Sequence, residues 1–341
     1  MGQQVRRRPL GNVLYQANSK VSISLSRGMI YRDIYLKYRG SVTPASDVGN
    51  SQALTLHGDE WGVVKRIDLI ANNTDVLRSI SGNQLWWLNY FLYGVPPNVT
   101  PGLGDDTLIE VPWTSYLVLP LWMPRSLRPM DTALDARELS DLKLEITWGD
   151  YMDIQVAATA FTVDPVLEIH SLESFGAKGP FSQWRVYAIE KAIAATAAQF
   201  QVQLPVGPMY RGFLLNFTEG AAAAITDTGA ILNNFKLISG TTVFADIPAG
   251  LLNVCDRLKQ SCSRFWDDDQ IGVQRYDGLR RGTTFNSLEG WYYYDHVTDG
   301  YLSESVDTLG FSEFELELDV TAGANSRVFV LPLQIIPVRG K

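Results

Sequence analysis

The chain has 341 residues, of which 46% are hydrophobic and 19% charged, a composition typical of well-packed globular proteins and unlike that of disordered ones. A formal net charge of −8 disfavours general polyanion binding, because phosphate contacts need clustered lysine and arginine. Nine Trp, fifteen Tyr and fourteen Phe, with frequent glycine and proline, favour strands joined by turns.

The first segment, MGQQVRRRPLGN, is locally basic, with Arg6, Arg7 and Arg8 in succession. We expect residues 1–19 to form a basic N-terminal arm that can reach nucleic acid, lipid head groups or an acidic partner. A solvated, disordered tail explains the same composition equally well. No apolar core follows the arginines and no run reaches membrane-span length, so we expect neither a secretory signal nor a membrane helix.

The first half then alternates between strand and loop patterns. Asn72 and Asn73 predict a turn, because asparagine tolerates left-handed backbone. Ser81 lies three residues before Gln84, the spacing of a capping box, and predicts a helix. Strands are predicted at residues 21–25, 29–38, 63–71, 115–121, 141–148 and 157–169.

In the second half, residues 172–183 have the loop composition of a domain boundary. Residues 188–198 predict either a short connecting helix or a strand. Asp246 and Pro248 are start signals for a helix over 249–258. Further strands are predicted at residues 200–204, 290–294, 311–321 and 327–338, with long insertions at 94–113 and 259–290.

Segments of the first half recur in the second half in the same order. LSRGMIYR at 25–32 matches LPVGPMYR at 204–211, a shift of 179 residues. IDLIANNT resembles FKLISGTT, LKLEITWG resembles LELDVTAG, and residues 161–169 resemble 329–336. A period near half the chain predicts a tandem pair of domains, because solenoid repeats are about 20–50 residues long.

We therefore expect a first copy over 20–172, a connector over 173–198 and a second copy over 199–341. Each copy offers about seven or eight strands, as jelly rolls do, although an immunoglobulin-like topology has a similar number. The predicted fold class is all-β, with two tandem jelly-roll β-sandwiches (a double jelly roll), short helices and long loop insertions.

No enzymatic pattern emerges. His57, His170 and His296 share no metal-ligand spacing, and neither a nucleophile elbow nor a phosphate-binding glycine loop is present. Acidic runs at 105–106 and 267–269 can in principle hold calcium or cleave glycosides, but solvated loop charge explains them more simply. We expect no catalytic activity, no metal and no cofactor.

Cysteines and tryptophans add little chemistry. Cys255 and Cys262, seven residues apart, match neither a disulfide framework nor a metal site, and free thiols are expected. Trp86, Trp87 and the aromatic run at 291–294 can bind sugars or partners, but core packing or burial at a subunit contact is the preferred interpretation.

The repeated LxxGxxYR segments, IDLIANNT with FKLISGTT, and LKLEITWG with LELDVTAG carry a resemblance over about residues 20–338. The chain resembles the double jelly-roll major capsid proteins of tailless icosahedral bacteriophages with an internal membrane. The resemblance implies a homotrimer that forms pseudo-hexagonal capsomers, is synthesised in the host cytoplasm and is located in the virion. It also implies tower loops or trimer contacts at 94–113 and 259–290, and vertex or minor capsid proteins as partners. Arg6, Arg7 and Arg8 would then face inward, toward membrane lipid or the genome.

The alternative is a carbohydrate-binding protein with two β-sandwich modules, using Trp266 or Trp291 and loop aspartates as a sugar platform. The missing export signal and the lack of a repeated Trp/Asp loop pattern disfavour it. A jelly-roll hydrolase ranks third, because no candidate catalytic residues stand out.

Overall fold

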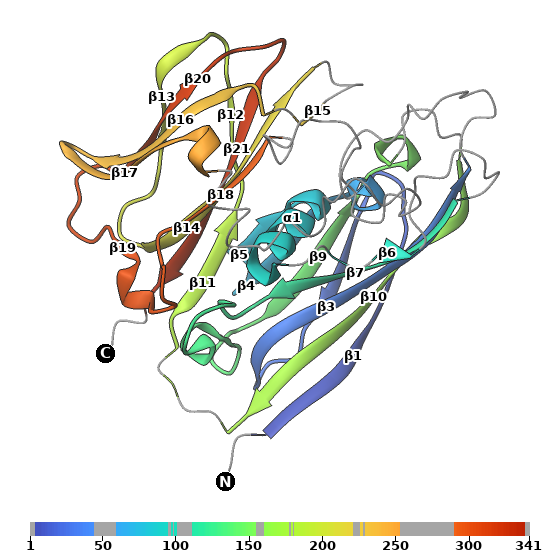
Figure 1. The fold of residues 1–341 in the computed structure, drawn as a ribbon. Helices are drawn as coiled ribbons and strands as arrows, with labels where there is room; N and C mark the ends of the chain where they lie inside the picture. Colours follow the sequence, from blue (N-terminus) through green and yellow to red (C-terminus); the bar gives the residue numbers. More distant parts are fainter. Residues whose placement is uncertain are drawn as a thin grey trace, which may run out of the picture. The chain divides into compact units, whose positions relative to one another are not determined.

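The computed structural model describes residues 4–43, 59–94, 97, 99–100, 111–154, 160–176, 179, 181–220, 226–227, 229–252 and 290–337 (Figure 1). Strands account for most of this part of the chain. It divides into two compact units, and the division between them falls after Trp184, within β11 (Gln183–Tyr187).

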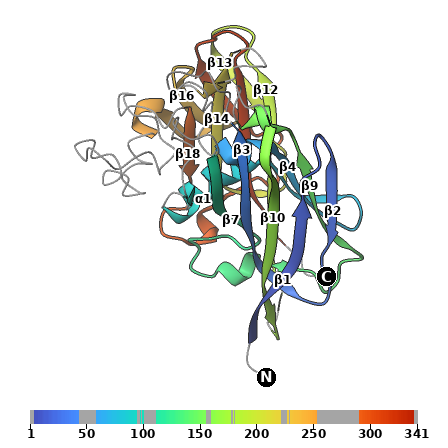
Figure 2. The ribbon, with the colours of Figure 1, turned by 90° about the vertical axis from the view of Figure 1, so that its right-hand side faces the viewer.

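Two antiparallel sheets make up the first unit. One sheet has the order β1 (Gln4–Leu14), β10 (Ala160–Phe175), β3 (Ile30–Thr43), β7 (Val111–Pro120) and β6 (Val99–Thr100), and β8 (Leu134–Asp135) pairs with β3. The other has the order β5 (Asp75–Ile80), β4 (Val64–Ala71), β9 (Leu142–Trp148) and β2 (Lys20–Ser24). Figure 2 shows β1, β10 and β3 side by side.

The two sheets pack face to face because their strands alternate. In β9 every second residue is buried, from Leu142 to Trp148, as the two-residue period of a strand requires. The ring centroid of Tyr38 on β3 lies 4.8 Å from that of Trp61 and 6.2 Å from that of Trp148, so tilted aromatic rings join the two sheets. A sandwich with an aromatic-rich core results.

Helix α1 (Gly82–Tyr93) starts at the predicted capping box. The N–H of Gln84 donates to Ser81 Oγ at 3.2 Å, and the N–H of Ser81 donates to Gln84 Oε1 at 2.9 Å. The helix ends at Gly94, whose φ of 75° is the left-handed conformation common after a helix C-terminus. Both helix ends therefore follow from local sequence.

Asn89 of α1 closes the exposed edge of β7. Its Nδ2 donates to the carbonyl of Val118 at 2.7 Å, and its Oδ1 accepts the N–H of Val118 at 2.8 Å. The side-chain amide thus occupies the position of a neighbouring strand's backbone. Figures 1 and 2 both show α1 beside β7.

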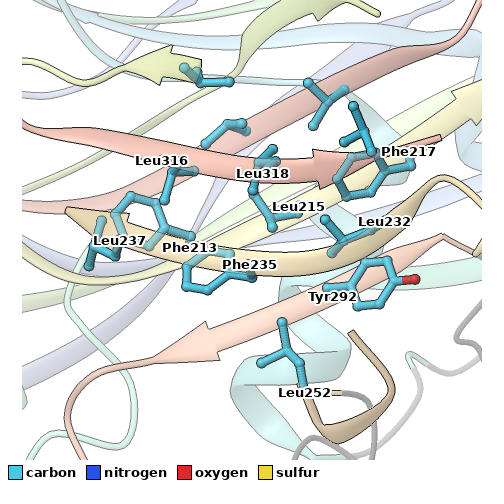
Figure 3. Packing of buried hydrophobic residues seen from close by; sticks show 14 of the residues in the cluster. Phe213, Leu215, Phe217, Leu232, Phe235, Leu237, Leu252, Tyr292, Leu316 and Leu318 are labelled. Carbon is cyan, nitrogen blue, oxygen red and sulfur yellow. The ribbon is translucent and has the colours of Figure 1, made fainter. Parts of the chain in front are cut away.

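The second unit repeats this architecture. In one sheet β14 (Met209–Glu219) pairs with β15 (Thr226–Asp227), β18 (Trp291–Asp295), β19 (Val306–Asp307) and β21 (Arg327–Ile336), and β21 pairs with β12 (Ile189–Ala192). The other has the order β13 (Ala197–Gln203), β20 (Glu315–Val320), β16 (Leu232–Ser239) and β17 (Thr242–Pro248). The facing sheets bury a core that includes Phe213, Phe235 and Leu318 (Figure 3).

Strand pairing confirms the duplication in detail. The ladder β2, β9, β4, β5 of the first unit corresponds to β13, β20, β16, β17 of the second. Register breaks recur as well: the break between Leu69 and Ile70 corresponds to that between Leu237 and Ile238. IDLIANNT and FKLISGTT therefore match in the predicted register.

Two of the other sequence matches identify the right strands in a different register. The N–H of Leu25 donates to Leu142, and the N–H of Leu204 donates to Phe314, both at 2.8 Å, so LKLEITW corresponds to FELELDV, two residues before the predicted match. A shift of two preserves the buried face, which is why the sequence pattern did not reveal it. On β10 and β21 the counterpart of Glu173 is Gln334, opposite Tyr31 and Tyr210 respectively.

Several expected segments have a different structure. The basic arm over 1–19 is largely strand β1, which forms the ladder with β10, and the connector over 173–198 contains β11 and β12. Of the two alternatives for 188–198, the strand is present, and the helix prediction is wrong. Residues 249–252 are helical, as predicted, whereas most of both insertions lies outside the described residues.

Asn89→Ala should lower the free energy of unfolding by about 2–4 kcal/mol, because it leaves a backbone N–H and a backbone C=O of β7 without partners. Chemical denaturation of the purified protein measures this. Asn83→Ala on the same helix is the matched control, since Asn83 Oδ1 has no hydrogen-bond partner in the part described. Equal effects of the two substitutions would contradict the edge-sealing role.

Candidate functional site

A buried tyrosine fixes the same corner in both units. Tyr31 Oη donates to the carbonyl of Ser26 at 2.6 Å, and Tyr210 Oη donates to the carbonyl of Pro205 at 2.5 Å. In each case the acceptor lies five residues before the tyrosine. The intervening glycine has a positive φ in both copies, 86° at Gly28 and 109° in its counterpart.

The residue after the tyrosine is a β-bulge in both copies. Arg32 and Arg211 are each skipped in the pairing with the neighbouring strand. Their carbonyls accept equivalent bonds at 2.8 Å, from the N–H of Leu121 and of His296 respectively. The side chains differ: Arg32 lies 5.0 Å from the ring centroid of Trp122, whereas Arg211 is buried and ion-paired.

Opposite the first tyrosine lies a fully buried carboxylate, Glu173, with 0% of its side chain exposed. Arg6 Nη2 approaches Glu173 Oε2 at 2.7 Å, and Arg8 Nη2 approaches Oε1 at 3.0 Å. Ser171 Oγ donates to Oε1 at 2.7 Å. Burial, together with the Glu173 charge, raises the pKa of Tyr31 to about 12, so its hydroxyl remains a donor.

The second copy satisfies the equivalent position without charge. Gln334 Nε2 donates to Tyr210 Oη at 2.8 Å and to Tyr187 Oη at 3.1 Å. Tyr187 stands 179 residues after Arg8, the shift that also relates the two corner tyrosines. A carboxylate with arginines in one copy is therefore replaced by an amide with a tyrosine in the other.

The predicted site residues Arg6, Arg7 and Arg8 do not act as one group. Successive side chains of a strand point to opposite faces, so Arg6 and Arg8 reach Glu173 while Arg7 points the other way. Arg7 lies 6.0 Å from the ring centroid of Tyr35 and forms no ion pair among the described residues. The sequence could not show this, because the partner strand lies about 160 residues away along the chain.

Other candidates from the sequence are not brought together. His170 is exposed on β10, and His296 Nδ1 lies 2.8 Å from Tyr294 Oη with its pKa lowered by burial. The described residues contain no cluster of three metal-ligating side chains. His57, both cysteines, both acidic runs and Trp266 lie outside the described part.

Tryptophans of the described part serve mainly as core. Trp86 and Trp87 on α1 are buried with ring centroids 5.0 Å apart, which is the packing interpretation that the sequence favoured. Trp291, proposed for the sugar platform, is only 2% exposed. This burial counts against the carbohydrate-binding alternative at that residue. No helix in the described ranges combines the length and hydrophobicity needed for a membrane span.

Sequence reasoning missed Asp33, which follows the bulge on β3. It is buried, its Oδ1 has no hydrogen-bond partner in the described structure, and burial raises its pKa to about 7. Trp122 and Arg32 favour the ionised form only in part, and Tyr93 and Tyr35 are the other titratable neighbours. The sequence signal that could have identified Asp33 is the presence of an aspartate within the strand pattern MIYRDIYLKY.

Together, the paired sheets, the repeated tyrosine corner and the strand-for-strand correspondence define a duplicated jelly-roll sandwich. No family model and no curated protein matches the sequence. Solved structures do match the fold. The STIV major capsid protein, from Sulfolobus Turreted Icosahedral Virus, has a TM-score of 0.71 at 15% identity, covering 98% of this chain and 97% of that one.

Two further similar structures agree. Major capsid protein P2 from bacteriophage PM2 has a TM-score of 0.62 at 14% identity, covering 99% of this chain and 100% of that one. The PBCV-1 virus capsid has a TM-score of 0.60 at 11% identity, covering 100% and 97%. The chain thus has the double jelly-roll fold of viral major capsid proteins, and the predicted fold class is confirmed.

The charge difference between the copies can be tested by grafting. Arg8→Tyr should cost about 2–4 kcal/mol, since it removes one cation from a buried carboxylate. Glu173→Gln should also destabilise, by removing the anion that Arg6 and Arg8 share. Together the two changes recreate the Tyr187–Gln334 pair, so we expect a favourable coupling of at least about 1 kcal/mol in denaturant unfolding. Strict additivity would refute the equivalence.

Asp33 makes stability depend on pH. Its folded pKa lies above the usual value of 3.8, so folding favours the protonated form. That contribution is complete below about pH 4 and is lost as pH rises through 7, which lowers the free energy of unfolding by up to about 4 kcal/mol. Asp33→Asn should flatten the thermal-melting profile between pH 5 and 8, whereas exposed Asp131→Asn should leave it unchanged. If the melting temperature of Asp33→Asn depended on pH as steeply as that of the wild type, the pH dependence could not be assigned to Asp33.

Proposed function

We propose that this chain is the major capsid protein of an icosahedral virus, and that it assembles as a homotrimer into pseudo-hexagonal capsomers. The observation that carries the proposal is the duplication itself: two jelly rolls whose main strands correspond, in the same order, within the described part of the chain. The similar solved structures described above, which cover 98–100% of this chain, are viral capsid proteins. We propose the first and second jelly rolls over 20–172 and 199–341, each with a preceding strand.

The physical logic connects duplication with tiling. Closed rings need heterologous contacts that repeat by rotation. Two similar domains per chain let a trimer present six similar edges, so it can occupy a site of near-sixfold symmetry. Divergence between the exposed residues of the two copies then allows alternate edges to contact different neighbours.

Other parts of the proposal concern partners. The insertions 94–113 and 259–290 form tower loops or trimer contacts, and vertex or minor capsid proteins bind the assembled shell. The start of β1 faces the interior of the particle, with Arg7 available to membrane lipid or the genome while Arg6 and Arg8 are held by Glu173. Synthesis in the host cytoplasm precedes assembly into the virion.

Assembly state tests the proposal directly. Size-exclusion chromatography with light scattering should give three times the 38.0 kDa chain mass. Negative-stain microscopy of the same fractions should show pseudo-hexagonal particles or sheets. A monodisperse monomer at high concentration, without such particles, would count decisively against a capsid role.

A further inference from the structure

The loop between β7 and β9 lies at the same end of the first unit as the start of β1. Arg6 Nη2 lies 3.4 Å from Met29 Sδ, and the N–H of Ala136 donates to the Met29 carbonyl at 2.9 Å. Ala133 of the loop packs with Ile30 at the start of β3. Figures 1 and 2 both place the green turn η2 (Pro129–Thr132) near the N-terminal end of β1.

Arginines gather at this end although the chain is acidic overall. The exposed ones are Arg6, Arg7, Arg27, Arg125, Arg128 and Arg137. Within the described structure, Arg7, Arg27 and Arg128 have no ion-paired carboxylate. The carboxylates present are Glu173, held by Arg6 and Arg8, Asp135, held by Arg137, Asp141, held by Lys143, buried Asp33 beside Arg32, and exposed Asp131 and Glu138. The local charge is therefore positive.

An exposed leucine stands among these arginines. Leu127 is 57% exposed and lies between Arg125 and Arg128 in the sequence. The packing at this end buries Ala133 and half-buries Met130, but it leaves Leu127 in solvent. Apolar side chains flanked by arginine are suited to the boundary between lipid head groups and acyl chains.

Nucleic acid fits the same end less well. Single-strand binding relies on aromatic faces onto which bases stack. At this end arginine side chains already lie against the rings: Arg32 is 5.0 Å from the centroid of Trp122, and Arg6 is 4.9 Å from that of Phe175. The exposed large apolar side chain of the loop, Leu127, is aliphatic, and phosphate backbones offer an aliphatic side chain no favourable contact.

The second unit provides an internal comparison. Because β8 and β19 pair with the two corner tyrosines in the same way, the β18–β19 loop corresponds to the β7–β8 part of the first loop, and it carries exposed Tyr301 between Asp299 and Glu304. Glu304 accepts the N–H of Thr298 at 2.6 Å, so one of these acidic groups is fixed within the loop. The same connection in the scaffold is therefore basic in the first copy and acidic in the second.

We propose that the β7–β9 loop of the first jelly roll binds the surface of an anionic lipid bilayer. Arg27, Arg128 and Arg7 contact lipid phosphates, and Leu127 enters the head-group region. This inference rests on the proposed function in one respect: it names the partner of the end that we assign to the particle interior.

Vesicle flotation with the full-length protein tests the proposal. The protein should float with vesicles that contain phosphatidylglycerol and phosphatidylcholine, should not float with phosphatidylcholine alone, and should dissociate at high salt. Arg128→Glu and Leu127→Asp should each lower partitioning about tenfold, because each removes a favourable contact and adds an unfavourable charge. Tyr301→Asp in the second unit is the matched control and should bind as wild type. Unchanged melting temperatures verify that each variant is folded.

Each outcome of these experiments supports or refutes the lipid-binding inference. Wild-type flotation of both Arg128→Glu and Leu127→Asp overturns the inference, as does binding of single-stranded DNA that Arg128→Glu abolishes while vesicles remain unbound. The mass measured by light scattering separates this inference from the capsid proposal. A trimer that ignores vesicles refutes only the lipid contact, and a monomer that binds vesicles through Leu127 refutes only the capsid role.

Discussion

The structure depends on one recurring requirement: the buried hydroxyl at each tyrosine corner, and the polar group opposite it, must have partners. A buried polar group without a partner costs roughly 1–3 kcal/mol. Tyr31 and Tyr210 satisfy their donors within the chain segment, at carbonyls five residues back. The group across the ladder then determines what the next strand must carry. The buried carboxylate of Glu173 requires cationic partners, and Arg6 and Arg8 of β1 form ion pairs with it. Gln334 demands only hydrogen-bond partners, and Tyr187 is one of them.

This requirement gives a physical reason for the most conspicuous charge run of the sequence. The sequence predicted either a basic arm that binds a partner or a solvated tail for the triple arginine, since three consecutive arginines neither alternate with apolar residues nor form a hydrophobic run. Two of its members are instead partners of a carboxylate on β10, more than 160 residues later. Local pattern cannot reveal such a pairing, since the information lies in a strand neighbour distant in sequence. The same limit explains why the sequence predicted no strand at β5. There Arg78 is buried against the ring of Trp184 and interrupts the apolar alternation.

Elements with local determinants were predicted well. The capping box at Ser81, the asparagine turn after β4 and the alternation of β9 each depend on neighbours within a few residues. The duplication was also visible, because the corner keeps its leucine, glycine, tyrosine and arginine. The register was harder to predict, because β9 and β20 alternate so regularly that a two-residue displacement leaves the same face buried. The pairings with β2 and β13 and the bonds from Leu25 and Leu204 show which register is present.

The two corners also show how a duplicated domain can diverge without loss of its fold. The bonds that hold each corner are made largely by backbone groups: the bulge carbonyl of Arg32 or Arg211 accepts an N–H at the same distance whatever its side chain does. The side chain of Arg32 can therefore lie on Trp122 while that of Arg211 pairs with Asp295. Because backbone hydrogen bonds hold the geometry of each corner, the surface residues of the adjoining loops can differ in charge without disrupting the fold. One loop is basic and the other acidic on a common scaffold, so a single chain carries two loops of opposite charge at equivalent positions of its two domains.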